Sequence, residues 1–181
     1  MKKILVMLVT IGLGASAALA QGGVGVFGSY LDGDDSGPGF GGGIKFKAAL
    51  ADFLAVEARA SCLTKFDEWE GDDELLVIPI EAALVFNLPL QDTPLTIYGG
   101  GGAGYAIIPE ADDIDYDDSF CYFALGGVEI ALGDTASLFA EVQYRILEVD
   151  GADYDGEDVD FGGDKLKFTG LGVNAGLLLR W

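Results

Sequence analysis

Residues 138–146 read LFAEVQYRI, and every second side chain in this segment is apolar. The apolar face consists of Leu138, Ala140, Val142, Tyr144 and Ile146. The opposite face carries Glu141, Gln143 and Arg145. A period of two residues is typical of a β-strand with two different faces, whereas an amphipathic helix repeats every 3.6 residues. The segment therefore predicts a strand that separates an apolar environment from a polar one.

The same alternation recurs along the whole chain after Gln21. Seven connections separate eight segments of this kind, which gives expected strands at residues 22–31, 38–48, 52–64, 75–88, 94–108, 119–132, 136–148 and 166–181. One face stays apolar for about ten residues in the clearest segments, enough for a tilted strand to cross a bilayer. We expect an all-β fold over residues 21–181, an eight-stranded antiparallel up-and-down transmembrane β-barrel.

Alternation alone does not show which face points outward, because a soluble lipocalin-like barrel has the same period with its apolar face inside. The distribution of acids distinguishes the two. The first, third, fifth and seventh connections hold 23 of the 30 acidic residues, whereas the short second, fourth and sixth hold only Asp92 and Asp134. Transmembrane barrels have short periplasmic turns and longer extracellular loops. The sequence therefore predicts a bacterial outer-membrane barrel with acidic extracellular loops, and a secreted lipocalin-like carrier of apolar ligands remains the alternative.

The N-terminal segment has the features of an export signal. Lys2 and Lys3 precede an apolar run, and small residues end the segment at Ala20. An anchor helix would need roughly 20 apolar residues, which this run lacks. We expect residues 1–20 to be a cleaved secretory signal peptide. Gln21, rather than a cysteine, follows the expected cleavage site, so a lipoprotein is not indicated.

Composition argues against several classes of function. The formal net charge is −20, so the phosphates of a nucleic acid would be repelled. The chain has no histidine, and enzymatic barrels of the outer membrane rely on histidine as the base or in its immediate support, so we expect no enzyme. Residues 99–104 formally match GxGxxG, but they lie inside an expected strand and do not open a helix.

Charged residues on the polar faces form the most informative group. They are Lys45, Lys47, Glu57, Arg59, Glu81, Glu129, Glu141, Arg145 and Arg180. The interior of an eight-stranded barrel is just wide enough for side chains to fill it, so these charges should pair there. A gated polar path is the alternative, and a large diffusion pore is disfavoured by the strand number.

The acidic connections also offer oxygen ligands for Ca²⁺ or Mg²⁺. The weak candidates for a metal site are Asp113, Asp115, Asp117, Asp150, Asp153 and Asp155. Neither group has the spacing of an EF-hand loop, and loops that are simply solvated remain the alternative. Weak divalent-ion binding is the only cofactor prediction, and bridging to lipopolysaccharide phosphates is one hypothesis for its use.

Cys62 and Cys121 lie near the outer ends of the third and sixth expected strands. An exported protein reaches an oxidising compartment, so a disulfide between them is one interpretation. Against it, the two strands are not neighbours and the side chains have opposite parity. Two separate buried thiols remain the other interpretation.

Aromatic residues on the apolar faces are candidates for the girdles that mark the membrane–water boundary. They are Tyr30, Phe40, Phe46, Phe86, Tyr105, Tyr122, Tyr144 and Trp181. Together with the signal peptide, the eight alternating segments, the glycine-rich first two strands and the aromatic last residue, this pattern resembles the OmpA/OmpX-type small outer-membrane β-barrel family. The resemblance covers the whole mature chain.

This resemblance implies a non-enzymatic protein with an internal salt-bridge network, in contact with outer-membrane lipid and lipopolysaccharide. It also implies that the barrel-assembly machinery reads the C-terminal aromatic residue, which places Trp181 where Phe is more usual. OmpA's peptidoglycan-binding domain has no counterpart in this sequence, so a cell-wall tether is not implied. The expected role is envelope integrity or surface contact, with the extracellular partner unknown. A narrow, porin-like passage for small solutes is the alternative.

Overall fold

The computed structural model defines the barrel and parts of its connections. It describes residues 22–33, 37–64, 76–109, 114–116, 119–149, 152–154, 157–159, 166–167 and 169–181. The expected signal peptide, residues 1–20, lies outside the described residues. These described ranges form no helix that is long and apolar enough to cross a membrane.

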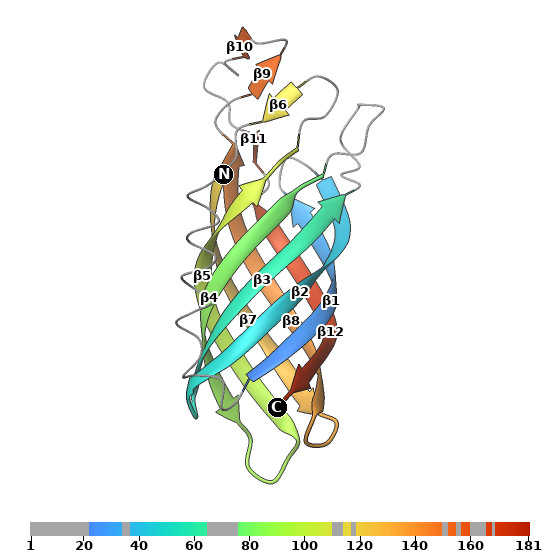
Figure 1. The fold of residues 1–181 in the computed structure, drawn as a ribbon, viewed down its shortest axis with the longest axis vertical. Helices are drawn as coiled ribbons and strands as arrows, with labels where there is room; N and C mark the ends of the chain where they lie inside the picture. Colours follow the sequence, from blue (N-terminus) through green and yellow to red (C-terminus); the bar gives the residue numbers. More distant parts are fainter. Residues whose placement is uncertain are drawn as a thin grey trace.

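Within the described ranges, eight long strands close into one antiparallel barrel (Figure 1). They are β1 (Gly22–Gly33), β2 (Gly37–Ala51), β3 (Leu54–Thr64), β4 (Ile78–Pro89), β5 (Leu95–Ile107), β7 (Ser119–Ala131), β8 (Ala136–Val149) and β12 (Gly170–Arg180). Each strand pairs with the next long strand in the chain, and β12 pairs with both β8 and β1. Every predicted segment overlaps one of these strands, so the predicted eight-stranded fold is confirmed.

Four short strands lie outside the barrel wall or extend it. β6 (Ile114–Tyr116), β9 (Ala152–Tyr154) and β10 (Glu157–Val159) form a small separate sheet in segments that the sequence predicted as loops. β11 (Leu166–Lys167) pairs with β8 and is separate from β12, so the predicted last strand is interrupted. Strands of two or three residues have too little alternation to be recognised in a sequence, because pairing with distant segments defines them.

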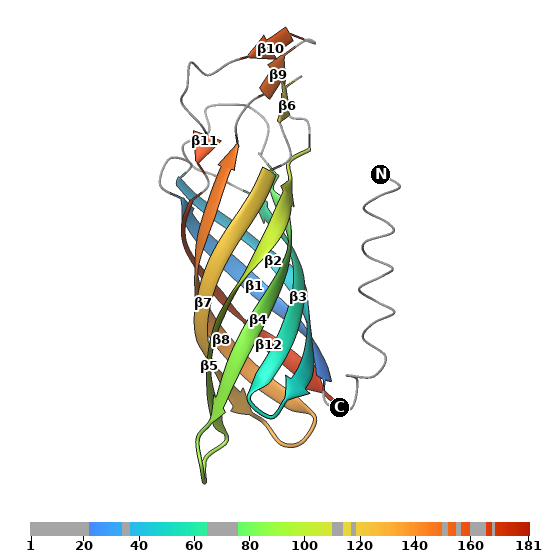
Figure 2. The same cartoon turned by 90° about the vertical axis from the view of Figure 1, so that its left-hand side faces the viewer.

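The two ends of the barrel differ, as Figures 1 and 2 show. At one end, here called the turn end, residues 52–53, 90–94 and 132–135 connect the strands tightly, and the C-terminus lies beside them. Asp92 (φ 59°) and Gly133 (φ 102°) adopt the left-handed conformation that such turns require. The small sheet lies at the opposite end, called the loop end, together with the strand ends that the long connections join.

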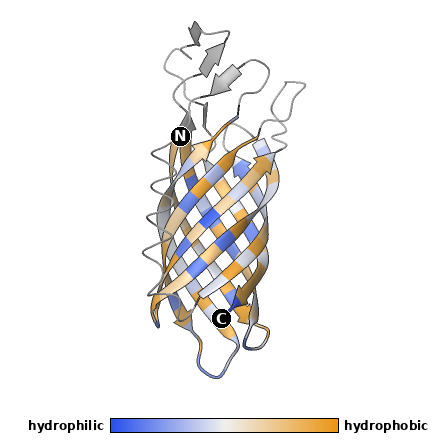
Figure 3. Ribbon diagram, viewed as in Figure 1, coloured by the Kyte–Doolittle hydropathy of each residue, from blue (hydrophilic) through white to orange (hydrophobic). Residues whose placement is uncertain are grey.

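The wall of the barrel is apolar outside and largely polar inside, and Figure 3 shows hydrophobic and hydrophilic residues alternating along the strands. Val26 and Ile44 are 58% and 59% exposed on the outer surface, whereas Lys45 and Glu57 are 2% and 0% exposed inside. Soluble proteins rarely bury charged residues completely and rarely expose a continuous apolar wall. The lipocalin-like alternative requires the apolar face to point inward, and the structure places it outward.

Aromatic rings form pairs on the outer surface near both ends. Tyr30 packs against Phe40 with ring centroids 5.0 Å apart near the loop end, and Tyr105 packs against Phe120 at 5.2 Å. At the turn end, the rings of Phe46 and Trp181 are 6.0 Å apart. All eight predicted girdle residues are at least partly exposed, which is the placement expected for aromatic residues at two membrane–water boundaries.

Glycines let large interior side chains lie flat against the wall. A Cβ atom on Gly127 would lie 2.5 Å from the carbonyl oxygen of Ala140 and 2.7 Å from Cζ of Tyr98. A Cβ atom on Gly43 would lie 2.5 Å from the ring of Phe27. Both positions need the close approach that only glycine permits.

Candidate functional site: the barrel interior and its vestibule

The structure places all nine predicted interior charges inside the barrel. Seven of them are buried, and Lys47 and Arg180, whose side chains are 15% and 31% exposed, lie toward the turn end. The nine comprise five cations and four carboxylates, so the interior is nearly neutral in a chain of net charge −20. The excess acid therefore lies almost entirely outside the interior.

Glu141, on β8, is the centre of the interior network. Its Oε1 accepts hydrogen bonds from Arg59 Nη1 at 2.5 Å and Asn174 Nδ2 at 3.0 Å. Its Oε2 accepts from the Tyr98 hydroxyl at 3.0 Å and lies 3.5 Å from Lys45 Nζ. Charge-assisted hydrogen bonds of this kind are about twice as strong as neutral ones. One carboxylate thus joins β2, β3, β5, β8 and β12 across the interior.

Glu57, on β3, extends this network. Its Oε2 accepts from Arg59 Nη2 at 2.8 Å and lies 3.6 Å from Lys45 Nζ. The Lys45 ammonium also sits 3.6 Å from the ring centroid of Phe139, and Arg59 lies over the ring of Phe123 at 5.5 Å. Cation–π contacts of this type add attraction when the cation is desolvated. Aromatic rings therefore fill the space that the ion pairs leave.

Glu81, on β4, forms a second group closer to the loop end. Its Oε1 lies 2.8 Å from Arg145 Nη2 and accepts hydrogen bonds from Arg145 Nε at 3.0 Å and Gln143 Nε2 at 3.1 Å. The Cys121 Sγ atom is 4.0 Å from the same oxygen. With this group, every interior carboxylate has a cation within 3.1 Å.

Apolar side chains fill the interior at the loop end. Each of these side chains lies at or next to the loop end of a strand and is at most 3% exposed. They are Leu31, Leu63, Val77, Ile108 and Leu147. Backbone hydrogen bonds of 2.9 Å between Leu63 and Val77 fix part of this loop-end cluster. A water-filled path across the barrel would have to pass through both the ion pairs and this cluster.

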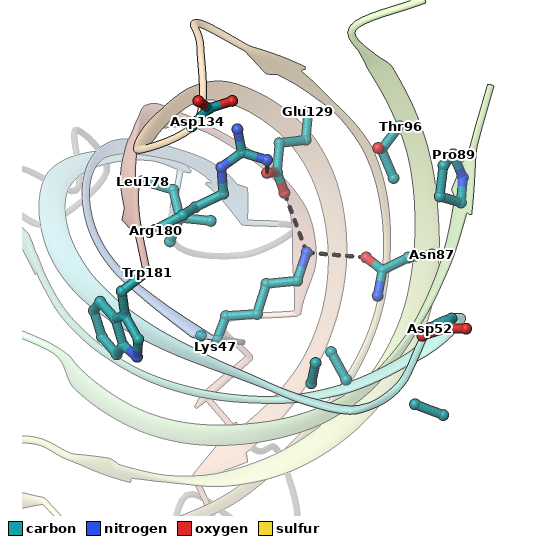
Figure 4. Close-up of a pocket in the computed structure, with 14 residues that line it drawn as sticks. Lys47, Asp52, Asn87, Pro89, Thr96, Glu129, Asp134, Leu178, Arg180 and Trp181 are labelled. Carbon is teal, nitrogen blue, oxygen red and sulfur yellow. Dashed lines mark hydrogen bonds and ion pairs between the residues drawn. The ribbon is translucent and has the colours of Figure 1, made fainter. Parts of the chain in front are cut away.

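At the turn end the interior widens into a vestibule, a cavity of about 440 Å³ (Figure 4). Lys47 projects into it and donates hydrogen bonds to Asn87 Oδ1 at 2.9 Å and Glu129 Oε2 at 3.1 Å. Glu129 Oε1 accepts a hydrogen bond from Ser137 Oγ at 2.7 Å. Arg180 lies beside Glu129, with 3.8 Å between Nη1 and Oε1. The vestibule is a described space that could admit a solute.

Several interior polar residues were not among the predicted site residues. They are Asn87, Tyr98, Ser137, Gln143 and Asn174. The signal that identifies four of them is parity, since each shares a strand face with a charged residue; Gln143, for example, lies between Glu141 and Arg145. Tyr98 shares its face with no charged residue on β5, so only the contact with Glu141 reveals its role.

The disulfide interpretation is wrong for this structure, because Cys62 and Cys121 are both free. Cys62 is exposed on the outer surface of β3, whereas Cys121 is fully buried on the inner face of β7. The strands β4 and β5 separate them in the barrel. Side chains on opposite faces of the wall and on strands that do not pair lie too far apart for a bond between sulfur atoms.

The candidate metal ligands are only partly described. Asp113, Asp117, Asp150 and Asp155 lie outside the described residues. Asp115 on β6 is the register partner of Asp153 on β9, which in turn pairs with Asp158 on β10. Weak binding of Ca²⁺ or Mg²⁺ stays a prediction.

Trp181 takes part in closing the barrel. Its backbone N donates to Gly22 O at 3.1 Å, and Gly22 N donates to Trp181 O at 3.3 Å. These bonds extend the β1–β12 ladder to the last residue. Recognition of Trp181 by the assembly machinery stays a prediction.

Comparisons with known proteins agree with this geometry. A family model described as "Outer membrane protein beta-barrel domain" matches residues 4–177. Neisserial surface protein A has a similar solved structure, with a TM-score of 0.64 and 15% identity over 88% of this chain and 95% of that one. No curated protein sequence matches the chain.

Two further solved structures share the fold. The N-terminal β-barrel domain of Pseudomonas aeruginosa OprF has a TM-score of 0.56 and 9% identity, covering 89% of this chain and 97% of that one. Ail, the attachment invasion locus protein of Yersinia pestis, has a TM-score of 0.52 and 15% identity, covering 89% and 98%. Identities this low support the fold alone.

Proposed function

We propose that this chain, which belongs to the outer membrane protein beta-barrel domain family and lies in the bacterial outer membrane, is a structural barrel without enzymatic activity. In this proposal the wall contributes to envelope integrity, and the acidic extracellular connections serve surface contact. The filled interior is the observation that carries the proposal. Within the described residues, ion pairs at Glu141, Glu57 and Glu81 and the loop-end cluster obstruct the interior to a solute.

The charge distribution supports the role of the connections. Of the 30 acidic residues, 23 belong to the four connections that the sequence predicts to be extracellular, and four of the other seven are neutralised in the interior. Such a surface repels polyanions and attracts cations and cationic groups. In proteins with a rigid scaffold, the binding residues frequently lie in the segments that connect the strands or helices. Divalent cations that bridge these acids to lipopolysaccharide phosphates would let the same connections contribute to envelope integrity as well as to surface contact.

Deletion of the gene from the producing bacterium is expected to raise its sensitivity to detergent, or to reduce its adhesion to a cationic surface. Complementation separates the two roles. The wild-type chain should restore both properties, whereas a variant with amides in place of the acids at residues 67–74 should restore detergent resistance and not adhesion. A deletion strain that matches the parent in both assays would overturn the proposal.

The vestibule favours one second candidate function, a narrow passage for small solutes, because it opens the interior to one side. We expect the purified barrel to give no stepwise conductance in a planar bilayer and no swelling of liposomes in sugar solutions. A general porin in the same lipid serves as the positive control. Faster migration of the unboiled sample on a gel verifies that the barrel is folded. Reproducible conductance steps in the folded sample would replace the structural proposal with the passage.

A further inference from the structure

The vestibule contains more positive charge than its inner carboxylate neutralises. Lys47 and Arg180 both approach Glu129, at 3.1 Å and 3.8 Å. Lys47 has one further acceptor, the neutral Asn87 amide, and Glu57 Oε1 lies 3.9 Å away. Since Glu57 is already paired with Arg59 at 2.8 Å, two cations share one carboxylate here. An anionic group entering the vestibule would therefore meet a surplus positive charge.

Arg180 has hydrogen-bond donors to spare. Its Nη2 donates to the carbonyl oxygens of Gly133 at 2.7 Å and Ala136 at 3.4 Å. Its Nη1 is 3.8 Å from Glu129, beyond hydrogen-bond length, and its buried Nε has no acceptor among the described residues. A buried donor without a partner lowers stability. A ligand that supplies an oxygen acceptor to this guanidinium would give Nη1 a partner closer than Glu129 Oε1 at 3.8 Å.

The rim of the vestibule carries the opposite charge. Asp52, in the β2–β3 turn, and Asp134, in the β7–β8 turn, are exposed and line the cavity. Neither carboxylate forms an ion pair with Lys47 or Arg180 in the part of the chain that the structure describes. Figure 4 shows Asp52 and Asp134 on different sides of the pocket, with the Lys47 ammonium between them in this view. A small dianion would be repelled at this rim, whereas a molecule with one charge of each sign would not.

We propose that the vestibule binds a small zwitterion, with a carboxylate or phosphate on Arg180 and Lys47 and an ammonium near Asp52 or Asp134. The cavity, at about 440 Å³, falls within the range of small-molecule sites, about 300–1,000 Å³. Short turns assign this end of the barrel to the periplasm. Two sources supply this chemistry there: a free amino acid or short peptide, and the phosphoethanolamine headgroup of an inner-leaflet lipid. This site lies at the end opposite the acidic connections, so its failure leaves the proposed function intact.

Trp181 lines the vestibule and provides the readout. The chain has two tryptophans, so a Trp69→Phe background isolates the emission of Trp181. The full barrel in phosphatidylcholine nanodiscs would be titrated with glycylglycine and with glycerophosphoethanolamine. We expect saturable changes with both, and changes at least about tenfold weaker with acetate or ethanolamine alone. Competition by phosphatidylethanolamine placed in the nanodisc would identify the headgroup as the source, and unchanged affinity would identify the free solute.

Variants test the assigned contacts. Arg180→Gln is expected to weaken binding of both zwitterions at least about tenfold, and Asp134→Asn should weaken zwitterions and ethanolamine without affecting acetate. Gln91→Ala, in an exposed turn outside the vestibule lining, is the matched control and should change nothing. If Arg180→Gln does not fold, Asp134→Asn still tests the ammonium contact. Absence of saturation with any zwitterion, equal affinity for acetate and glycylglycine, or unchanged binding by folded Arg180→Gln would overturn the proposal.

Discussion

Replacing Glu141 by alanine is expected to lower the free energy of unfolding by about 3–5 kcal/mol. The substitution removes the shared acceptor of Arg59, Lys45, Tyr98 and Asn174, and it leaves the two cations with Glu57 as the nearest carboxylate. Breaking a buried pair from one side costs far more than removing the whole pair, because an uncompensated charge stays buried. Urea unfolding of the barrel in lipid vesicles, followed by gel migration without boiling, measures the change.

A double substitution and a surface substitution complete this test. Glu141→Met combined with Arg59→Met should be less destabilised than Glu141→Ala, since no unpaired cation remains from that pair. Asp92→Asn, in an exposed turn, should stay within about 0.5 kcal/mol of the wild type. A loss below about 1 kcal/mol for Glu141→Ala would contradict the central role assigned to this carboxylate.

Val142→Arg is expected to cost about 2–4 kcal/mol of stability in vesicles. Val142 is 48% exposed on the outer surface in the middle of β8, so the new guanidinium would face hydrocarbon. The penalty depends on the lipid, because the same position in a soluble barrel would face water and tolerate arginine. The same urea titration measures it.

The matched control is Gln91→Arg, which places the same side chain in an exposed turn at the end of the barrel. It should change the free energy of unfolding by no more than about 0.5 kcal/mol. If Val142→Arg were equally neutral, the outer surface of β8 could not be in contact with lipid. If Val142 lay between the bilayer midplane and the interface, the loss of unfolding free energy would be smaller than the loss expected at the midplane.

The strands and their two faces were predictable because each depends on local alternation. Residues 138–146 place five apolar side chains on one face and three polar or charged side chains on the other, where Phe139 is the one apolar exception. The nine interior charges follow from the same rule. A metal site could not be predicted in the same way. Asp113 and Asp150 lie in connections outside the predicted strands, so the sequence does not indicate which residues are their neighbours.

Which interior residues touch could not be predicted, because contacts across the barrel depend on its closure. Glu141 and Lys45 are 96 residues apart in the chain. Tyr98 reaches Glu141 only because Gly127, on the neighbouring strand, leaves room for its ring. The free state of Cys121 likewise depends on which strands separate it from Cys62.

The sequence by itself determined the number of long barrel strands, the apolar outer wall, the set of interior charges and the acidity of the connections predicted at one end. These properties follow from a two-residue period and from the positions of charged residues between strands, both of which are local. Only the tertiary structure decided the pairing around Glu141, the apolar loop-end cluster and the vestibule, in which two cations meet Glu129 inside and two acids lie at the rim. Each of these depends on register between strands far apart in the chain, and register is fixed when the β8–β12–β1 seam closes the barrel.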